Sequence, residues 1–180
     1  MKVVSTDLAG VVILEPDVYS DERGFFLESY NKRVLAKCGI NDEFVQDNHS
    51  RSVKNVLRGL HYQIQQPQGK LVRVTAGEVF DVVVDLRRHS ATFGKWSGFT
   101  LSAGNKCIAW IPQGFAHGFL ALSDYAELLY KTTDYYAPEY ERSILWNDPE
   151  IGIDWPLREE PILSIKDRTG KPLKAAEVFA

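Results

Sequence analysis

Short runs of alternating apolar and polar residues recur along the chain, and turn-forming residues separate them at intervals of roughly 8–12 positions. Side chains of a β-strand point alternately to its two faces, so each run predicts a strand that buries one face. Many short strands at this spacing are typical of a β-sandwich or barrel. The predicted strands cover residues 11–15, 24–29, 44–52, 56–63, 70–77, 78–85, 96–101, 106–111, 116–121 and 126–132.

One helix is predicted, at residues 31–37. Asn31 can cap its first turn with a side-chain oxygen, and Gly39 supplies a C-terminal stop. After Asp134 the alternation ends, and prolines at positions 138, 149, 156, 161 and 172 favour a loop-rich tail that wraps the strands, with short helical turns. No repeat or linker divides the chain, so residues 1–180 are expected to form a single all-β domain with a jelly-roll fold.

Composition excludes several classes of protein. Hydrophobic residues make up 44% of the chain and charged residues 25%, which is ordinary for a globular protein, and the formal net charge is −3. Acids and bases are mixed, so we expect neither nucleic acid nor a membrane as a partner. The amino terminus lacks the apolar segment of a signal peptide, and the two cysteines form no CxxC pair. These features predict unpaired thiols in a reducing cytoplasm.

His61 is the first candidate for chemistry. It lies inside the predicted strand 56–63, with Arg58 before it and Lys70 after it. A lone histidine on a strand is usually structural, and the cations on either side make proton transfer the alternative. Arg58 lies three residues away and would point to the other face of a regular strand. The two side chains can line one pocket only if Gly59 introduces a bulge or bend.

Two later segments can complete a site for proton transfer beside a carbonyl. Tyr130 is otherwise a core aromatic, but a phenol with a pKa of about 10 can donate a proton. Asp167 would ordinarily be a surface turn residue, yet a carboxylate beside His61 would orient the imidazole and stabilise its protonated form. Lys166 adds a cation next to Asp167. The set suits a substrate that carries a phosphate.

A metal site is the main alternative, because jelly-roll barrels often hold metals through clustered histidines. Such clusters usually contain His-x-His, and His61 is not part of one. His117 and Glu78 are possible further ligands, although their spacing gives little support.

Nucleotide motifs are also missing: the chain has no GxGxxG, and residues 69–70 lack the rest of a P-loop. A diphosphate would have to be bound by arginines and lysines, with an aromatic face for the base.

Several segments, taken in order, resemble those of the dTDP-4-dehydrorhamnose 3,5-epimerases. They are residues 23–28 (RGFFLE), 46–48 (QDN), 58–63 (RGLHYQ), 68–70 (QGK), 111–119 (IPQGFAHGF), 130–136 (YKTTDYY), 146–149 (WNDP) and 153–156 (IDWP). The resemblance extends over about residues 5–170, and no single motif carries it. Ile165 departs from the family pattern, which commonly has Glu there, but Lys166 and Asp167 are retained.

The resemblance implies a cupin-type jelly roll, a homodimer, no metal or other cofactor, and a place in the dTDP-L-rhamnose pathway. The implied substrate is dTDP-4-dehydro-6-deoxy-D-glucose. Implied catalytic residues are His61 as base, Tyr130 as acid, Asp167 as the partner of His61, and Lys70 near the C4 oxygen. Implied substrate-binding residues are Gln46, Asn48, Arg58, His117, Tyr136 on the thymine, Glu141 and Lys166. Arg23, Phe25 and Glu28 resemble the segment that reaches the nucleotide of the neighbouring subunit.

The chemistry follows from the substrate. The hydrogens at C3 and C5 flank the C4 ketone, so removal of either gives an enolate whose charge a cation at the oxygen can stabilise. Inversion needs a second group on the opposite face. Three alternatives stay open: an epimerase that inverts only C3 or only C5, a non-catalytic cupin that senses a nucleotide sugar, and a metal-dependent cupin oxygenase.

Overall fold

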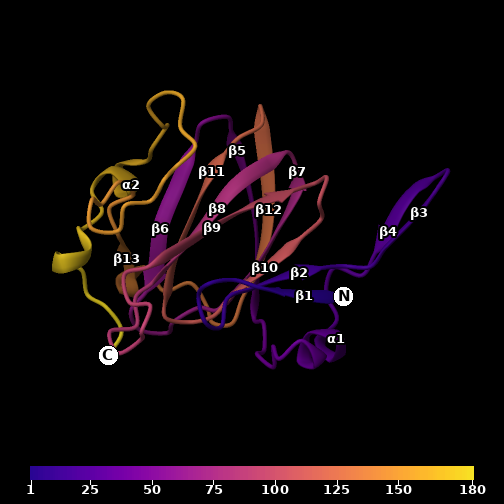
Figure 1. Ribbon diagram of the computed structural model, residues 1–180, viewed down its shortest axis with the longest axis horizontal. Helices are drawn as coiled ribbons and strands as arrows, with labels where there is room; N and C mark the ends of the chain where they lie inside the picture. Colours follow the sequence, from indigo (N-terminus) through magenta and orange to yellow (C-terminus); the bar gives the residue numbers. More distant parts are fainter.

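The computed structural model describes residues 1–4 and 6–180 in full, and residue 5 through its backbone alone. Most of the regular secondary structure consists of strands, and the helices are short (Figure 1). The strands are β1 (Lys2–Ser5), β2 (Val12–Glu15), β3 (Val18–Asp21), β4 (Gly24–Leu27), β5 (Gln46–Val53), β6 (Leu57–Gln63), β7 (Lys70–Ala76), β8 (Glu78–Asp85), β9 (Trp96–Ser102), β10 (Ile108–Ile111), β11 (Phe115–Ala121), β12 (Tyr125–Thr132) and β13 (Glu141–Ser143). The helices are α1 (Lys32–Lys37), α2 (Ile165–Arg168) and the 3₁₀ turns η1 (Pro138–Tyr140) and η2 (Leu173–Ala175).

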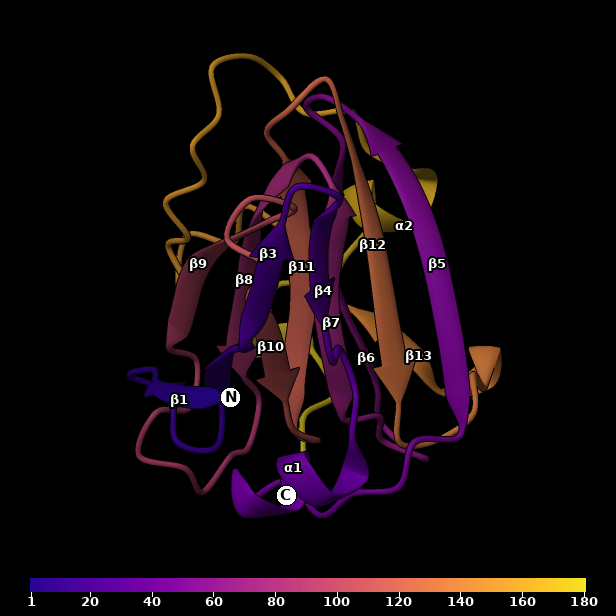
Figure 2. The same cartoon turned by 90° about the vertical axis from the view of Figure 1, so that its right-hand side faces the viewer.

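Two antiparallel sheets face each other in a sandwich (Figure 2). One has the strand order β1-β2-β10-β7-β12-β5, and the other has the order β13-β6-β11-β8-β9. Apart from the pairs β1–β2 and β8–β9, neighbouring strands in each sheet are not consecutive in the chain, as in a jelly roll. The predicted all-β jelly roll is therefore confirmed.

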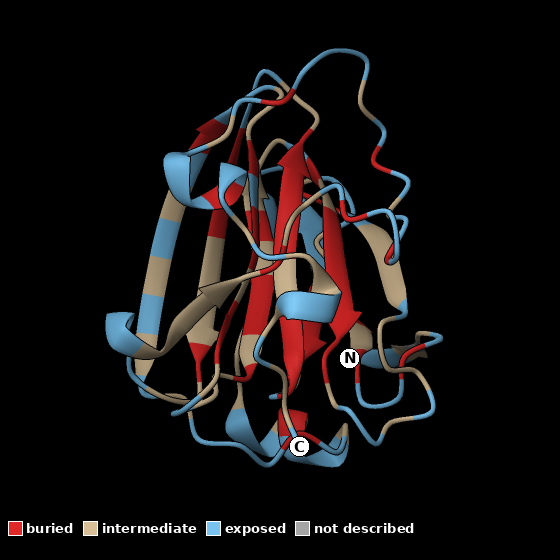
Figure 3. Cartoon of the chain, turned by 90° about the vertical axis from the view of Figure 1, so that its left-hand side faces the viewer, coloured by how far each residue is buried: buried red, intermediate tan, exposed pale blue. Residues whose placement is uncertain are grey.

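The main core lies between the two sheets. Val72 of β7, Val83 of β8 and Leu128 of β12 belong to one buried cluster there. Strand β8 is buried along almost its whole length, because the tail covers its outer face with residues such as Trp155. A strand buried on both faces reads as a continuous apolar run, as VFDVVVD does. Figure 3 shows these central strands as the most deeply buried part of the chain.

The carboxyl-terminal tail is fastened to the sandwich along its length. Asp148 accepts a hydrogen bond of 2.6 Å from the backbone N–H of Leu173. Further on, Arg142 pairs with Glu177 at 2.9 Å, and the ring of Phe179 packs against Tyr62. The tail therefore runs as a covering layer over one sheet, and its α2 segment lies beside β6 (Figure 1).

The helix prediction is confirmed: Asn31 accepts hydrogen bonds from Arg33 N and Val34 N, and Gly39 follows with φ +85°. The predicted strands are present, with ends that differ by a few residues. Strands β1, β3 and β13 and helix α2 were not predicted. Each has only three or four residues, which is too short to display a period, so partner strands and local caps decide their conformation. No helix among the described residues has the length and apolar character needed to cross a membrane.

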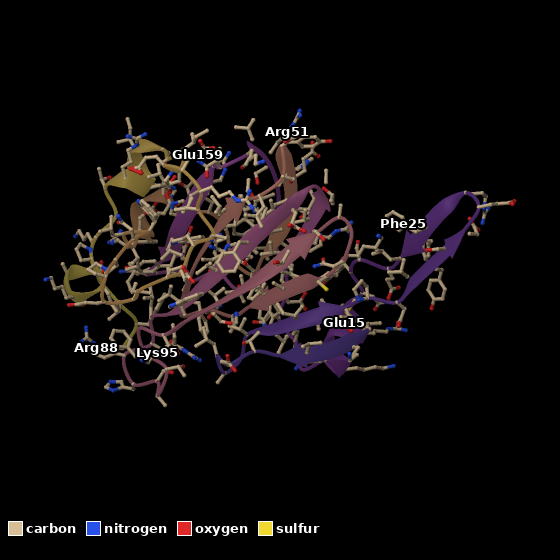
Figure 4. All side chains as sticks on the ribbon, turned by 45° about the horizontal axis from the view of Figure 1, so that its top comes forward. Glu15, Phe25, Arg51, Arg88, Lys95 and Glu159 are labelled. Atoms are coloured by element: carbon tan, nitrogen blue, oxygen red, sulfur yellow. The ribbon has the colours of Figure 1, made fainter. Side chains whose placement is uncertain are left out.

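The β3–β4 hairpin stands away from the sandwich (Figures 1 and 4). Its aromatic side chains are exposed, including Phe25 and Phe26, the latter at 70% of its surface. Arg23 at the turn pairs with Asp21 at 2.5 Å, and the Lys106 ammonium lies 4.5 Å from the ring centre of Phe25. The hairpin thus presents exposed aromatic rings, and its turn carries Arg23 together with the acids Asp21 and Glu22.

Strand β6 contains a bulge at Gly59. His61 pairs with His117, whereas Arg58 pairs with Phe119, so β6 has one more residue than β11 between these pairs. The extra residue allows Arg58 and His61 to line the same cavity, as expected if Gly59 introduces a bulge. Gly59 has φ +122°, and a Cβ there would meet the Cα of Gly118 and lie 2.8 Å from the carbonyl oxygen of His117.

We expect Gly59→Ala to lower the free energy of unfolding by about 3 kcal/mol, since it combines a strained φ with overpacking against backbone. Gly39→Ala is the matched control: its φ is +85° but no atom lies within 4 Å of the added Cβ, so about 1 kcal/mol is expected. Urea unfolding measures both. Equal losses in the two variants would show that the close approach to β11 is unimportant.

Candidate active site

A cavity of about 530 Å³ opens inside one end of the sandwich. Strands β5, β7 and β12 of one sheet and β6 and β11 of the other supply its walls, and β13 and α2 border it. Most of the residues singled out by sequence line it: Gln46, Asn48, Arg58, His61, Lys70, His117, Tyr130, Tyr136, Glu141, Lys166 and Asp167. Arg23, Phe25 and Glu28 do not, because they lie on or just after the projecting hairpin.

Asp167 is the buried partner of His61. Its Oδ1 lies 2.6 Å from Nε2 of His61 and accepts a bond of 3.2 Å from the Gly59 N–H. Its Oδ2 accepts a bond of 2.6 Å from the hydroxyl of Ser164, the residue that caps α2. Burial alone would raise the pKa of this carboxyl, but the hydrogen bonds from His61, Ser164 and Gly59 bring it to about 2. Asp167 is therefore an ionised, oriented carboxylate.

The pKa of His61 is lowered from its usual value near 6.5. Burial is the largest cause, and the charges of Lys166 and Lys70 act in the same direction, while Asp167 opposes them. A neutral imidazole beside an ionised carboxylate donates from the nitrogen that faces it, here Nε2. Nδ1 then keeps its lone pair, so His61 is suited to accept a proton.

Lys70 and Tyr130 lie on the opposite sheet from His61. Burial lowers the pKa of Lys70 to about 8, and its ammonium donates a bond of 3.3 Å to the backbone carbonyl of His61. Burial raises the pKa of Tyr130, although the Arg58 charge opposes this, so the phenol stays protonated at neutral pH. A proton acceptor and a proton donor therefore reach the cavity from different sheets.

The mouth of the cavity carries a linked set of polar side chains. Lys166 pairs with Glu141 at 2.7 Å, and the hydroxyl of Tyr136 donates to the other oxygen of Glu141 at 3.0 Å. Burial would raise the pKa of Glu141, but these two bonds hold it below its usual value. Tyr136 is 52% exposed, so its ring is open to a ligand.

Sequence reasoning did not find Ser164 or Asp81. Ser164 and Asp167 form a capping box, which the Ser-x-x-Asp spacing could have revealed. Asp81 is fully buried within the valine run of β8, and both of its oxygens lie 3.0 Å from Nε2 of His117. A carboxylate buried within an apolar strand needs a hydrogen-bond partner, so Asp81 could have been recognised from the sequence as a residue that binds another polar side chain.

The structure brings two of the possible metal ligands, His61 and His117, into one cavity but not the third, Glu78. Glu78 is exposed at the start of β8 and does not line the cavity, and His117 pairs with Asp81. Over residues 1–4 and 6–180, no group of three or more His, Cys, Asp or Glu side chains is arranged to hold a metal ion. Activity without a metal remains a prediction.

Comparisons with known proteins give one consistent result. Residues 5–175 match the family model described as dTDP-4-dehydrorhamnose 3,5-epimerase. A Pseudomonas aeruginosa protein of that name is 62% identical over 99% of both chains. The crystal structure of an epimerase from Legionella pneumophila, in complex with dTDP-4-keto-L-rhamnose, has a TM-score of 0.95 and 56% identity, covering 98% of this chain and 94% of that one. A 3′-monoepimerase from Streptomyces bikiniensis has a TM-score of 0.89 and 33% identity, covering 94% and 86%.

The two shifted groups predict a bell-shaped pH profile of kcat/KM for proton abstraction next to a ketone. His61 must be neutral to accept a proton, so activity should fall as the pH drops through its pKa, below 6.5. Lys70 must be charged to stabilise an enolate, so activity should also fall as the pH rises through about 8. In Lys70→Arg, whose cation does not titrate, the remaining activity should lose the alkaline decline. An unchanged decline would assign it to another group.

Proposed function

The chain belongs to the dTDP-4-dehydrorhamnose 3,5-epimerase family, and from this we propose that it converts dTDP-4-dehydro-6-deoxy-D-glucose to dTDP-4-dehydro-L-rhamnose by inverting C3 and C5. The observation that carries the proposal is the His61–Asp167 pair, at 2.6 Å, in a cavity that Tyr130 enters from the opposite sheet. Family membership favours this isomerase over a nucleotide-sugar sensor or an oxygenase.

In the proposed mechanism, Nδ1 of His61 takes the proton from C3 or C5. The electrons of that C–H bond form a C=C bond to C4, and the carbonyl electrons move to oxygen, where the Lys70 ammonium stabilises the enolate charge. Tyr130 then donates its proton to the same carbon from the other face, and the carbonyl is restored. Solvent returns a proton to Tyr130 and removes one from His61. The sequence runs once for each carbon.

The remaining residues of the cavity suit a nucleotide diphosphate. Arg58 and Lys166 are cations on its wall, and Gln46 and Asn48 add amides. A planar guanidinium can bind two phosphate oxygens through parallel N–H donors, a geometry that an ammonium does not offer. We assign the exposed ring of Tyr136 to stacking on thymine, with Glu141 and His117 completing the contacts to the substrate.

We further propose a homodimer in which the hairpin of one subunit reaches the nucleotide bound by the other. Arg23, Phe25 and Glu28 lie outside this chain's own cavity, and the aromatic hairpin surface is exposed. Apolar surface of this kind marks interaction sites. The chain would act as one domain, and the two free thiols, Cys38 and Cys107, are compatible with a cytoplasmic enzyme.

Inversion of C3 alone or C5 alone is the alternative function. It is favoured by the similarity of the chain to a 3′-monoepimerase, with which it shares 33% identity. The deciding experiment is incubation with dTDP-4-dehydro-6-deoxy-D-glucose in D₂O. NMR of the product shows which carbons gain deuterium and in which configuration. Deuterium at both C3 and C5 with both centres inverted supports the proposal, and a single inverted centre supports the alternative.

His61→Ala should reduce kcat by about 10²–10⁴-fold, the usual contribution of a general base. Asp167→Asn should also reduce it severely, because the neutral amide no longer stabilises the protonated imidazole. Steady-state assays and a thermal unfolding control measure both. A folded His61→Ala protein that keeps more than about a tenth of the wild-type rate would contradict the assignment.

Tyr130→Phe should lose inversion more than it loses proton exchange. Phe preserves the packing of the ring and removes only the donor, so His61 can still take a proton and return it to the same face. NMR in D₂O should therefore show deuterium in the substrate without epimerised product. Equal losses of exchange and inversion would instead indicate a binding or packing role for Tyr130.

A mixed dimer tests the shared site. One chain carries Arg23→Lys and the other His61→Ala, so a shared arrangement leaves one pocket with both changes and one with neither. That heterodimer should keep roughly half the wild-type activity, from counting the sites in a two-fold dimer. Each homodimer provides a control. An inactive but folded heterodimer, or a fully active monomer, would contradict the arrangement.

A further inference from the structure

The turn that carries Tyr136 is held by side-chain amides from three separate segments. Gln68 Nε2 donates to the carbonyl of Asp134 at 2.8 Å, and Gln46 Oε1 accepts from the N–H of Tyr136 at 2.9 Å. Gln63 binds the carbonyl of Tyr135 and the N–H of Ala137, on either side of Tyr136. Every residue of the turn from 134 to 137 thus has a backbone group bound by one of these amides.

The side-chain amide of Gln63 forms hydrogen bonds through both its oxygen and its nitrogen. Its side chain is buried, with 4% of the residue exposed. Oε1 accepts from Ala137 N at 2.9 Å, and Nε2 donates to Tyr135 O at 3.2 Å and to Gln66 O at 2.8 Å. A buried amide with bonds at both ends has one stable orientation, since rotating it would leave donors and acceptors unpaired.

Gln63 also lies on the strand that carries the proposed base. It is two residues after His61 on β6, so both side chains project from the same face of that strand. Strand β6 is held on both sides, by β11 and β13. The position of the Tyr136 turn is therefore fixed relative to His61 through one strand and one amide.

We propose that Gln63 is a positioning residue that sets the span between His61 and the ring of Tyr136. The inference rests on the proposed function, in which the sugar lies at His61 and the base at Tyr136. The diphosphate of the substrate must bridge that span. Gln63 lines the same cavity, and through its bonds to Tyr135 and Ala137 it would favour ligands that carry a base at the correct distance from the sugar.

The test compares Gln63→Met with wild type. Met has similar length but neither donates nor accepts a strong hydrogen bond at that position. We expect dTDP to bind about tenfold more weakly by calorimetry, which corresponds to about 1.4 kcal/mol. Inhibition by inorganic pyrophosphate, which has no base to stack, should stay within about twofold of wild type, and kcat at saturating substrate within about threefold. Gln65→Met is the matched control, because Gln65 is exposed and makes no hydrogen bond to the described residues.

A double-mutant cycle with Tyr136→Ala tests whether Gln63→Met weakens dTDP binding through Tyr136. If Gln63 acts through Tyr136, Gln63→Met should weaken dTDP binding no further in the Tyr136→Ala protein. If Gln63→Met does not fold, Gln68→Met, which removes the bond to Asp134 alone, should show the same selectivity for dTDP over pyrophosphate.

Two results would overturn the proposal: dTDP affinity equal to wild type, or equal weakening of dTDP and pyrophosphate, which indicates a general loosening of the cavity. Additive losses in the cycle would also overturn it. Wild-type protein that neither binds dTDP nor epimerises the sugar would instead reject the proposed function, so the two failures are distinguishable.

Discussion

A carboxylate can remain charged inside a protein only if hydrogen bonds replace its water, and Asp167 imposes this requirement on the whole site. Two of its partners are distant in sequence, the Gly59 N–H at the bulge and the His61 ring on β6, and the third is the Ser164 hydroxyl at the start of its own helix α2. The hydrogen bonds to this one carboxylate thus hold the bulge, the His61 ring and the tail together. The low pKa of Asp167, about 2, reflects how completely this is achieved.

The apolar core and the candidate active site occupy different parts of the sandwich. Apolar residues such as Val83 and Leu128 fill the space between the sheets, while the same inner faces carry ionisable groups around the cavity. The transition occurs within single strands: on β8, Val83 belongs to the core and Asp81 supports His117. Because close-packed strands deform little, side chains on opposite sheets keep a fixed separation, which stereochemical inversion requires.

Alternation in the sequence predicted most strands of the two sheets, although not β1 or β13, and the capping residues predicted the helix α1, since those signals are local. The short elements β13 and α2 could not be predicted in this way, because their conformation depends on β6 and on the buried carboxylate of Asp167. The candidate residues were found largely through family resemblance. The pattern around Gly59 indicated only that a bulge was possible. The Ser164–Asp167 capping box is a local signal that the sequence contains, whereas the role of Asp81 depends on His117 of a neighbouring strand and could not be predicted.

The wrapping tail has a consequence for the order of events during synthesis. His61 leaves the ribosome 106 residues before Asp167, and every strand of the two sheets precedes α2 in the chain. A nascent chain can therefore assemble its strands while the imidazole still lacks the carboxylate that orients it. Synthesis adds about 5–20 residues per second, so Asp167 follows the end of β13 at Ser143 by about 1–5 s. The orienting carboxylate is therefore added to the site after the framework that holds the imidazole has been synthesised.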